Sequence, residues 1–256
     1  MTATPQRGDD VGLSEVFQEI VYHRSILEMI QAGYLADLRA LQVRLKADFH
    51  GLHTRAGDFI DSEVESLLLE SDAPRLITKA YLEHARSRKG LIFTPTVKLA
   101  HLMADVFQHS GLVAEAIDGT TPLDERRAML RRFHTGKTQV LANCGVLTEG
   151  FDEPSVDCVV IARPTKSATL FTQMIGRGTR LHPGKQDCLI LDVAGVSQRH
   201  DLMNVPNLVG LPLDALKNGK SVIEAIIEKE EEQQRQHRIG EVVAQSVDLF
   251  RRRPMH

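Results

Sequence analysis

Two arginines in the second half of the chain have the type and spacing that phosphoryl chemistry requires. Residues 173–180 read QMIGRGTR, so Arg177 and Arg180 are three positions apart, on the same side of a helical turn. A phosphoryl group in transfer spreads negative charge over its oxygens, and the planar, permanently charged guanidinium group matches that geometry. This segment therefore indicates a site that stabilises a transferring phosphoryl group. A surface cluster of salt bridges is the simpler alternative.

Three further segments place hydroxyl groups or a carboxylate after short apolar runs. Hydroxyl groups and helix N-termini bind phosphate oxygens well. Gly150 permits a tight backbone path, and Asp152 would place a carboxylate beside a cleft. Ordinary strand-to-helix turns and a capped helix with a solvated basic face are the alternatives for the first two segments. The candidates are Thr94 and Thr96 in LIFTPTV (91–97), Thr120 and Arg127 in DGTTPLDERRAMLRRF (118–133), and Thr148, Gly150 and Asp152 in VLTEGFDEP (146–154).

These segments lie within an alternating pattern that predicts an α/β domain over residues 90–200. Short apolar runs alternate with helical stretches, which is typical of a parallel sheet with helices on both faces. In such folds the working residues lie on loops at the carboxyl ends of the strands, so we expect all four segments at one rim of a five-stranded sheet. The runs are residues 91–93, 115–118, 139–142, 157–162 and 188–192, with helices near 97–109, 122–134 and 168–176.

Helical segments are expected on both sides of this domain. Apolar residues recur at helical spacing from residue 13 until Gly33, over 58–70, and from 72 to 89, where Pro74 lies in the first turn. We therefore expect residues 11–89 to form a helical unit. Residues 201–256 predict a helical extension, in which a short apolar stripe is followed by the solvated stretch EKEEEQQRQHR.

The composition excludes several classes of protein. The formal net charge is −3, so any binding to nucleic acid must come from a local surface. The N-terminus lacks a signal pattern and no apolar stretch is long enough for a membrane span, which predicts a cytoplasmic protein without a membrane segment. We expect no metal site built by the protein, because the histidine pair at 50 and 53 has no third ligand nearby and the cysteines, Cys144, Cys158 and Cys188, are too widely spaced.

Taken in this order, the segments resemble the second RecA-like domain of superfamily-two helicases of the DEAD/DEAH-like type, most closely the bacterial and phage DNA-repair branch that includes RadD-like proteins. The resemblance covers residues 88–195: LIFTPTV is similar to motif IV, VLTEGFD to motif V and QMIGRGTR to motif VI. It implies a RecA-like fold with two groups of site residues. Nucleic-acid contacts are expected from Thr94, Thr96, Thr120, Arg127 and Thr148, and contacts to the ATP site from Gln173, Arg177, Arg180, Gly150 and Asp152.

The N-terminus also resembles a helicase motif. Thr2-Ala3-Thr4-Pro5 is similar to motif III. This implies that residues 1–10 are the remainder of a first RecA-like domain, that Thr2 and Thr4 couple the two lobes, and that residues 11–89 form a helical connector. The chain shows no phosphate-binding loop, because Gly136-Lys137-Thr138 has Arg131 where that pattern needs its first glycine.

Two functions follow from these patterns. The first is the C-terminal half of an ATP-dependent DNA helicase or translocase, with ATP and Mg²⁺ bound mainly by a separate RecA-like lobe that a split gene encodes. Such a chain would have no ATPase activity alone. The second is a non-catalytic module, a truncated remnant that binds nucleic acid or protein. The tail contains no cluster of carboxylates or metal ligands that would support an appended nuclease.

Overall fold

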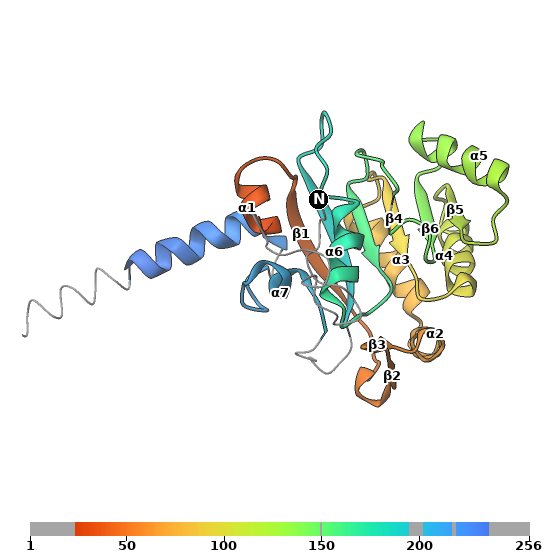
Figure 1. The fold of residues 1–256 in the computed structure, drawn as a ribbon, viewed down its shortest axis with the longest axis horizontal. Coiled ribbons are helices and arrows are strands. Elements are labelled where there is room, and N and C mark those ends of the chain that lie inside the picture. Colours follow the sequence, from red (N-terminus) through yellow and green to blue (C-terminus); the bar gives the residue numbers. More distant parts are fainter. Residues whose placement is uncertain (1–23, 149, 195–201, 217–218, 236–256) are drawn as a thin grey trace, which may run out of the picture.

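A six-stranded parallel sheet forms the centre of the protein. The computed structural model describes residues 24–148, 150–194, 202–216 and 219–235. All five pairings between neighbouring strands are parallel, in the order β1-β8-β7-β4-β6-β5 (Figure 1). This confirms the predicted α/β fold with a parallel sheet. The strands are β1 (Asp37–Arg44), β4 (Gly90–Phe93), β5 (Ala114–Ile117), β6 (Val140–Asn143), β7 (Cys158–Ile161) and β8 (Asp187–Ala194).

Apolar side chains project from both faces of the sheet, and each face packs against a layer of helices. Ile92 of β4 points into one core, together with side chains of α2, α3 and α4. Its neighbours Leu91 and Phe93 point into the other, together with side chains of α1, α5, α6 and α7. The helices are α1 (Ile26–Gln31), α2 (Asp61–Glu70), α3 (Ala73–His84), α4 (Val97–His109), α5 (Leu123–His134), α6 (Ala168–Gly176) and α7 (Val205–Val209).

The expectation that residues 11–89 are helical is wrong at Asp37–Arg44. This segment is β1, which pairs along eight residues with β8, from Asp37 opposite Asp187 to Arg44 opposite Ala194. It adds a sixth strand to the five that were expected. A short 3-10 helix and a two-stranded hairpin follow it before the predicted helices α2 and α3, which are confirmed. They are η2 (Phe49–Gly51), β2 (Thr54–Arg55) and β3 (Asp58–Phe59).

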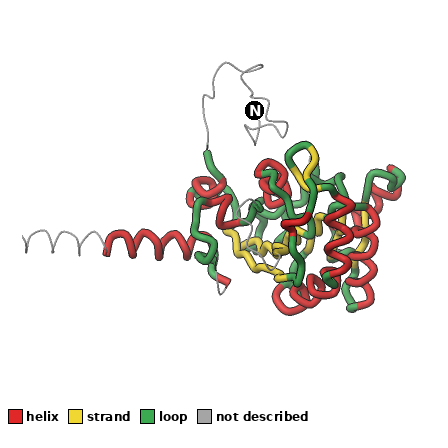
Figure 2. Tube along the Cα trace, turned by 90° about the horizontal axis from the view of Figure 1, so that it is seen from below, coloured by secondary structure: helices red, strands yellow, loops and turns green. Residues whose placement is uncertain are grey.

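The C-terminal part of the described chain returns to the edge strand β1, where Ser221 forms an isolated antiparallel bridge with Arg39. Residues 222–235 are helical, as the apolar stripe predicted, and Val222 and Ile226 are buried in the core that contains α6. From residue 227 onward this helix is exposed on all sides, and both Figures 1 and 2 show it extending away from the sheet. Residues 201, 217–218 and 236–256 of the predicted extension lie outside the described residues, as do Thr2, Thr4 and the first part of the helix expected from residue 13. No helix in the described ranges has the length and apolar character for crossing a membrane.

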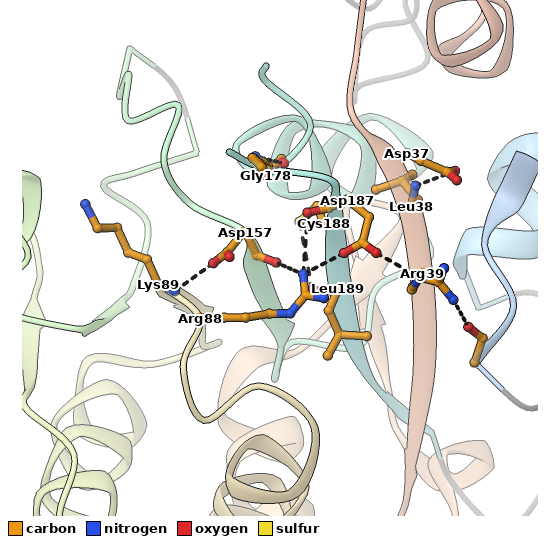
Figure 3. Close-up of polar contacts among 12 residues, drawn as sticks. Asp37, Leu38, Arg39, Arg88, Lys89, Asp157, Gly178, Asp187, Cys188 and Leu189 are labelled. Atoms are coloured by element: carbon orange, nitrogen blue, oxygen red, sulfur yellow. Dashed lines mark hydrogen bonds and ion pairs between the residues drawn. The ribbon is translucent and has the colours of Figure 1, made fainter. Parts of the chain in front are cut away.

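A network of charged groups fastens the amino ends of four strands together (Figure 3). Arg88, just before β4, donates from Nη1 to the Asp157 carbonyl at 3.0 Å and to Asp187 Oδ1 at 2.6 Å. Arg39 of β1 donates to the other oxygen of Asp187 at 2.8 Å, and the Lys89 amide donates to Asp157 Oδ1 at 2.7 Å. Hydrogen bonds to charged groups are stronger than neutral ones. These bonds therefore hold the first residues of the four strands in fixed positions relative to one another.

Candidate functional site

Helix α6 carries the two arginines to the edge of the sheet where the strands begin. The Ser167 side chain caps the helix by accepting from the Leu170 amide at 3.2 Å, and Phe171 and Met174 are buried against the sheet. Because β7 and β8 are parallel, the connection between them must return from the carboxyl edge to the amino edge. Helix α6 makes that return, so the residues after Gly176 lie toward the amino edge.

The guanidinium groups of Arg177 and Arg180 converge on one carbonyl oxygen. Arg177 donates from Nη1 to the Phe151 carbonyl at 2.6 Å and from Nη2 to the Thr148 carbonyl at 2.5 Å. Arg180 donates from Nη1 to the same Phe151 carbonyl at 2.9 Å. Its Nη1 also lies 2.7 Å from Asp152 Oδ1 in an ion pair whose side chains are 30% and 71% exposed. The structure therefore brings both arginines to the segment that holds Gly150 and Asp152.

Gly178, between the two arginines, packs directly onto the sheet. A Cβ atom at this position would lie 2.3 Å from the Cys188 Sγ and 2.7 Å from the Val159 Cγ2, far inside normal contact. Both neighbours are fully buried side chains of central strands. Figure 3 shows Gly178 beside Cys188 at the start of β8. Only a residue without a side chain allows the turn after α6 to approach the sheet this closely.

The segment from 144 to 157, called the crossing segment below, joins the two edges of the sheet. It starts after β6 and ends before β7, and its described residues form turns and bends instead of a helix. Since β6 and β7 both pair in parallel with β4, this segment must cross the sheet from carboxyl edge to amino edge. The Thr148 and Phe151 carbonyls both accept from the Arg177 guanidinium group, so the part of this segment around Gly150 reaches the turn after α6. Gly150, with φ +68°, allows the path between them.

The expectation that all four segments meet at the carboxyl rim is thus wrong. The loops after β4 and β5 and the start of the segment after β6 lie at the carboxyl edge, whereas Arg177 and Arg180 follow α6 and lie toward the opposite edge. The sequence rule applies to loops that directly follow strands, and the two arginines follow a helix. The crossing segment is what links them to the rest of the site.

At the carboxyl edge, the threonines of the first segment are engaged within the protein. Thr94 is 1% exposed, and its hydroxyl contacts the carbonyls of Thr96 at 2.9 Å and Asn143 at 3.1 Å. Thr96 caps α4 by accepting from the Leu99 amide at 3.2 Å and donates its proton to Glu65 of α2. These hydroxyls shape the loop between β4 and α4. The Thr94 hydroxyl does not reach the surface.

The turn after β5 presents its threonine to solvent around a buried carboxylate. Thr120 is exposed, and both its amide and its hydroxyl donate to Asp118 Oδ1, at 2.7 and 2.6 Å. The other oxygen of Asp118 lies 2.9 Å from His101 Nε2. The Thr120 hydroxyl, ahead of the opposing effect of burial, and His101 lower the pKa of Asp118. Arg127, on the first turns of α5, is 65% exposed and lies 3.8 Å from the Asp124 carboxylate.

The structure adds two residues that the sequence analysis did not consider. Asn143 is fully buried at the end of β6, where its side chain donates to the Ile92 carbonyl at 2.9 Å and accepts from the Leu147 amide at 3.4 Å. It therefore orients the start of the crossing segment. In the sequence, Asn143 could have been noticed as a polar residue at the end of an apolar run. Lys185, in the turn before β8, contacts four backbone carbonyls.

Gln173 is half-buried on α6, one turn before Arg177, and has an interaction of its own within the protein. Among the described residues, no three histidine, cysteine or acidic side chains are grouped closely enough to hold a metal ion.

Comparison with known proteins identifies the family to which this geometry belongs. The model of the family described as helicase conserved C-terminal domain matches residues 72–182, a range that includes α3, the motifs after β4, β5 and β6, and both arginines. The chain carries the C-terminal domain of a superfamily-two helicase.

Two yeast proteins are similar to this chain over most of its length. IRC3 of Saccharomyces cerevisiae, named as an ATP-dependent helicase, is 37% identical over 227 residues, which are 87% of this chain and 33% of IRC3. Its namesake in Schizosaccharomyces pombe, named as a mitochondrial ATP-dependent helicase, is 40% identical over 222 residues, or 85% of this chain and 36% of the relative. The chain thus spans about a third of the length of these relatives.

A solved structure shows the same fold. The fragment of an HsdR subunit of a type I restriction enzyme from Vibrio vulnificus superposes with a TM-score of 0.66 at 25% identity, covering 83% of this chain and 42% of that one. The coverage extends well beyond the 72–182 family match. The assignment to a RadD-like branch within superfamily two stays a prediction.

Proposed function

We propose that this chain forms the arginine-bearing half of the ATP site of a helicase or translocase that moves on nucleic acid. A first RecA-like lobe would hold ATP and Mg²⁺ through its phosphate-binding loop, on another polypeptide as the sequence analysis expected. The observation that carries this proposal is the convergence of the Arg177 and Arg180 guanidinium groups beside Asp152. Two fixed cations at one place suit the charge of a transferring phosphoryl group.

The two arginines differ in their contacts and exposure, which suggests different roles. Arg177 is held by carbonyls of Thr148 and Phe151 and acts mainly to fix the crossing segment. Arg180 forms an ion pair with a carboxylate that is largely exposed, and exposed ion pairs contribute only about 0–1 kcal/mol. A phosphate group on the facing lobe can therefore replace Asp152 at small cost. We assign the direct phosphate contact to Arg180, with Gln173 and Gly150 lining the same face.

Nucleic acid, DNA in this proposal, would bind along the carboxyl edge. Thr120 and Arg127 are exposed there, and Thr148 lies in the first half of the crossing segment. Contacts from the first segment would come from Thr96 and from the backbone around Thr94, since the Thr94 hydroxyl is buried. The crossing segment would then connect movement at the strand to the position of the arginines, with Thr2 and Thr4 coupling the lobes. A role in DNA repair and a cytoplasmic location extend the same proposal.

The test is turnover by the reconstituted pair. The full chain is mixed with the candidate first-lobe protein, ATP, Mg²⁺ and single-stranded DNA, and phosphate release is measured. Arg180→Ala should lower kcat by about three powers of ten or more, the range that such arginines contribute in related enzymes. Arg75→Ala is the matched control, because Arg75 is 67% exposed in the first turn of α3 and forms an ion pair with Asp72, the residue before the helix. Normal turnover by both Arg177→Ala and Arg180→Ala would refute the assignment.

A second candidate function is a binding module without turnover. It is favoured by the internal engagement of Arg177, which gives that residue a structural task even when no nucleotide is bound. The same mixture separates the two functions. Binding of single-stranded DNA with no hydrolysis, even when the first-lobe protein is supplied, would favour the module.

A further inference from the structure

We propose that Lys185 is a positioning residue that sets the location of Arg180 for catalysis. The inference deepens the proposed function and rests on it. Lys185 lies outside the helicase C-terminal match, which ends at residue 182. It also lies outside every motif that the sequence analysis considered. Its role is read from the backbone atoms that its side chain contacts.

The Lys185 ammonium group joins two stretches of backbone that the site must keep together. Nζ donates to the carbonyls of Gly178 at 2.5 Å and Arg180 at 2.9 Å, which belong to the turn after α6. It also donates to the carbonyls of Val156 at 2.5 Å and Pro154 at 3.2 Å, which belong to the crossing segment. One cation thus braces the backbone of Arg180 against the segment that contains Asp152.

This brace complements the contacts of the arginine side chains. Arg177 ties the turn after α6 to the carbonyls at 148 and 151, and Lys185 ties the same turn to the carbonyls at 154 and 156. Between these two sets of contacts, Gly178 lets the turn lie directly against the sheet. Arg180 is therefore fixed through its backbone while its side chain stays partly exposed. That combination suits a group that must point accurately at a ligand.

The local chain geometry delivers the lysine to this position. Gly184 has φ +82°, and the Lys185 amide donates to the His182 carbonyl at 3.1 Å, so residues 182–185 form a tight turn. The turn directs the Lys185 side chain back over the residues that precede it, just before β8 begins at Asp187. An ammonium group has three N–H donors and a positive charge, so it can serve four carbonyls when two of them share one N–H.

Loss of the brace should affect the chemical step more than nucleotide binding. A displacement of about 1 Å in a catalytic group can cost about a hundredfold in rate. We expect Lys185→Met to lower kcat of the reconstituted pair by 10- to 100-fold. The KM for ATP should change less, by about threefold or below, because the facing lobe supplies most of the binding contacts to ATP.

A double-substitution experiment separates a positioning role from a general structural one. Phosphate release is measured under single-turnover conditions, which keep slow variants measurable, for the unchanged chain, Lys185→Met, Arg180→Ala and the combination. If Lys185 acts through Arg180, Lys185→Met has little further effect once Arg180 is alanine. A general loss of structure would slow both backgrounds equally. Lys79→Met is the control, since Lys79 is 65% exposed on α3.

The outcomes distinguish this inference from the proposed function. Full turnover by Lys185→Met, or an undiminished effect in the Arg180→Ala background, overturns the positioning role and leaves the proposed function standing. Normal turnover by Arg180→Ala overturns the positioning role, and normal turnover by Arg177→Ala as well overturns the proposed function. Amide hydrogen exchange of residues 176–182 adds a readout without ATP, and it should rise in Lys185→Met. If that variant fails to fold, Lys185→Gln, which keeps two N–H donors on a shorter side chain, takes its place and should show the same selective loss of kcat.

Discussion

Replacing Gly178 by alanine would insert a methyl group where the turn after α6 meets the sheet. The new Cβ would lie 2.3 Å from Cys188 Sγ and 2.7 Å from Val159 Cγ2. Attractive contacts between carbon atoms begin near 3.5 Å, so either the turn or the strands must move by about 1 Å. Both neighbours are fully buried on β7 and β8, so any movement shifts them against other core side chains.

The expected loss of stability is about 2 kcal/mol. Inserting a methyl group into a well-packed core typically costs about 1–3 kcal/mol, and the two short contacts place this site in the upper part of that range. Alanine also restricts the unfolded chain, which returns about 0.4–1 kcal/mol. For a protein of this size, a net loss of about 2 kcal/mol lowers Tm by about 4–8 °C.

Urea unfolding followed by circular dichroism measures this difference, and the chain offers two controls. Gly176→Ala, two residues earlier, has nothing within 4 Å of the new Cβ and should change the free energy of unfolding by less than about 1 kcal/mol, in the stabilising direction. Cys188→Ala added to Gly178→Ala removes the closest atom and should recover part of the loss. Burial raises the pKa of the Cys188 thiol to about 12, so that replacement removes volume and no charge. The packing argument is refuted if Gly178→Ala is as stable as the unchanged chain, or if Gly176→Ala costs as much.

Three further substitutions test other parts of the structure. Burial raises the pKa of Asp192 from 3.8 to about 8, so the folded state retains a proton that the unfolded state releases, and stability should fall between about pH 4 and pH 8 by up to about 1.4 kcal/mol per pH unit. Asp192→Asn should remove this dependence; urea midpoints at pH 5 and pH 8 that shift equally in both chains would contradict it. Thr96→Ala removes the cap of α4 and should lower the free energy of unfolding by about 1 kcal/mol, whereas Thr135→Ala, at an exposed helix end, should cost clearly less. Asp187→Asn leaves Arg39 and Arg88 without their shared carboxylate and should cost about 1–3 kcal/mol in the same assay, with an unchanged midpoint as the contrary result.

The parallel sheet and most of its helices could be predicted from the sequence because their signals are local. The runs around Leu91, Leu141 and Val159 are apolar on both faces, as expected of strands covered on both sides. Edge strand β1 was missed although a signal was present. Apolar and polar residues alternate from 41 to 49, which overlaps the last four residues of β1; Leu41 is half-buried, and the other apolar members, Val43, Leu45, Ala47 and Phe49, are buried. The interpretation of residues 11–89 as helical passed over this alternation. The pairing of β1 with β8, about 150 residues away in the chain, has no local signal at all.

For the site, the sequence indicated the residue types but could not show their surroundings. Thr94 and Thr120 look alike in the sequence as hydroxyls after apolar runs, yet one is buried and the other exposed. The Thr94 hydroxyl hydrogen-bonds to the carbonyl of Asn143 on the neighbouring strand, and this tertiary contact has no signal in the sequence. The four carbonyls around Lys185 are equally invisible, since backbone atoms have no sequence signature.

The position of β1 and β8 matters for anyone who would prepare a shorter piece of this protein. A fragment trimmed to residues 72–182 ends before Asp187 and starts after Arg44, so it would lack two of the six strands. Strand β7, whose residues Cys158–Ile161 are all fully buried in the whole chain, would become an apolar edge strand with unpaired backbone amides and carbonyls. Such edges recruit strands from other molecules, and the trimmed fragment would be expected to precipitate.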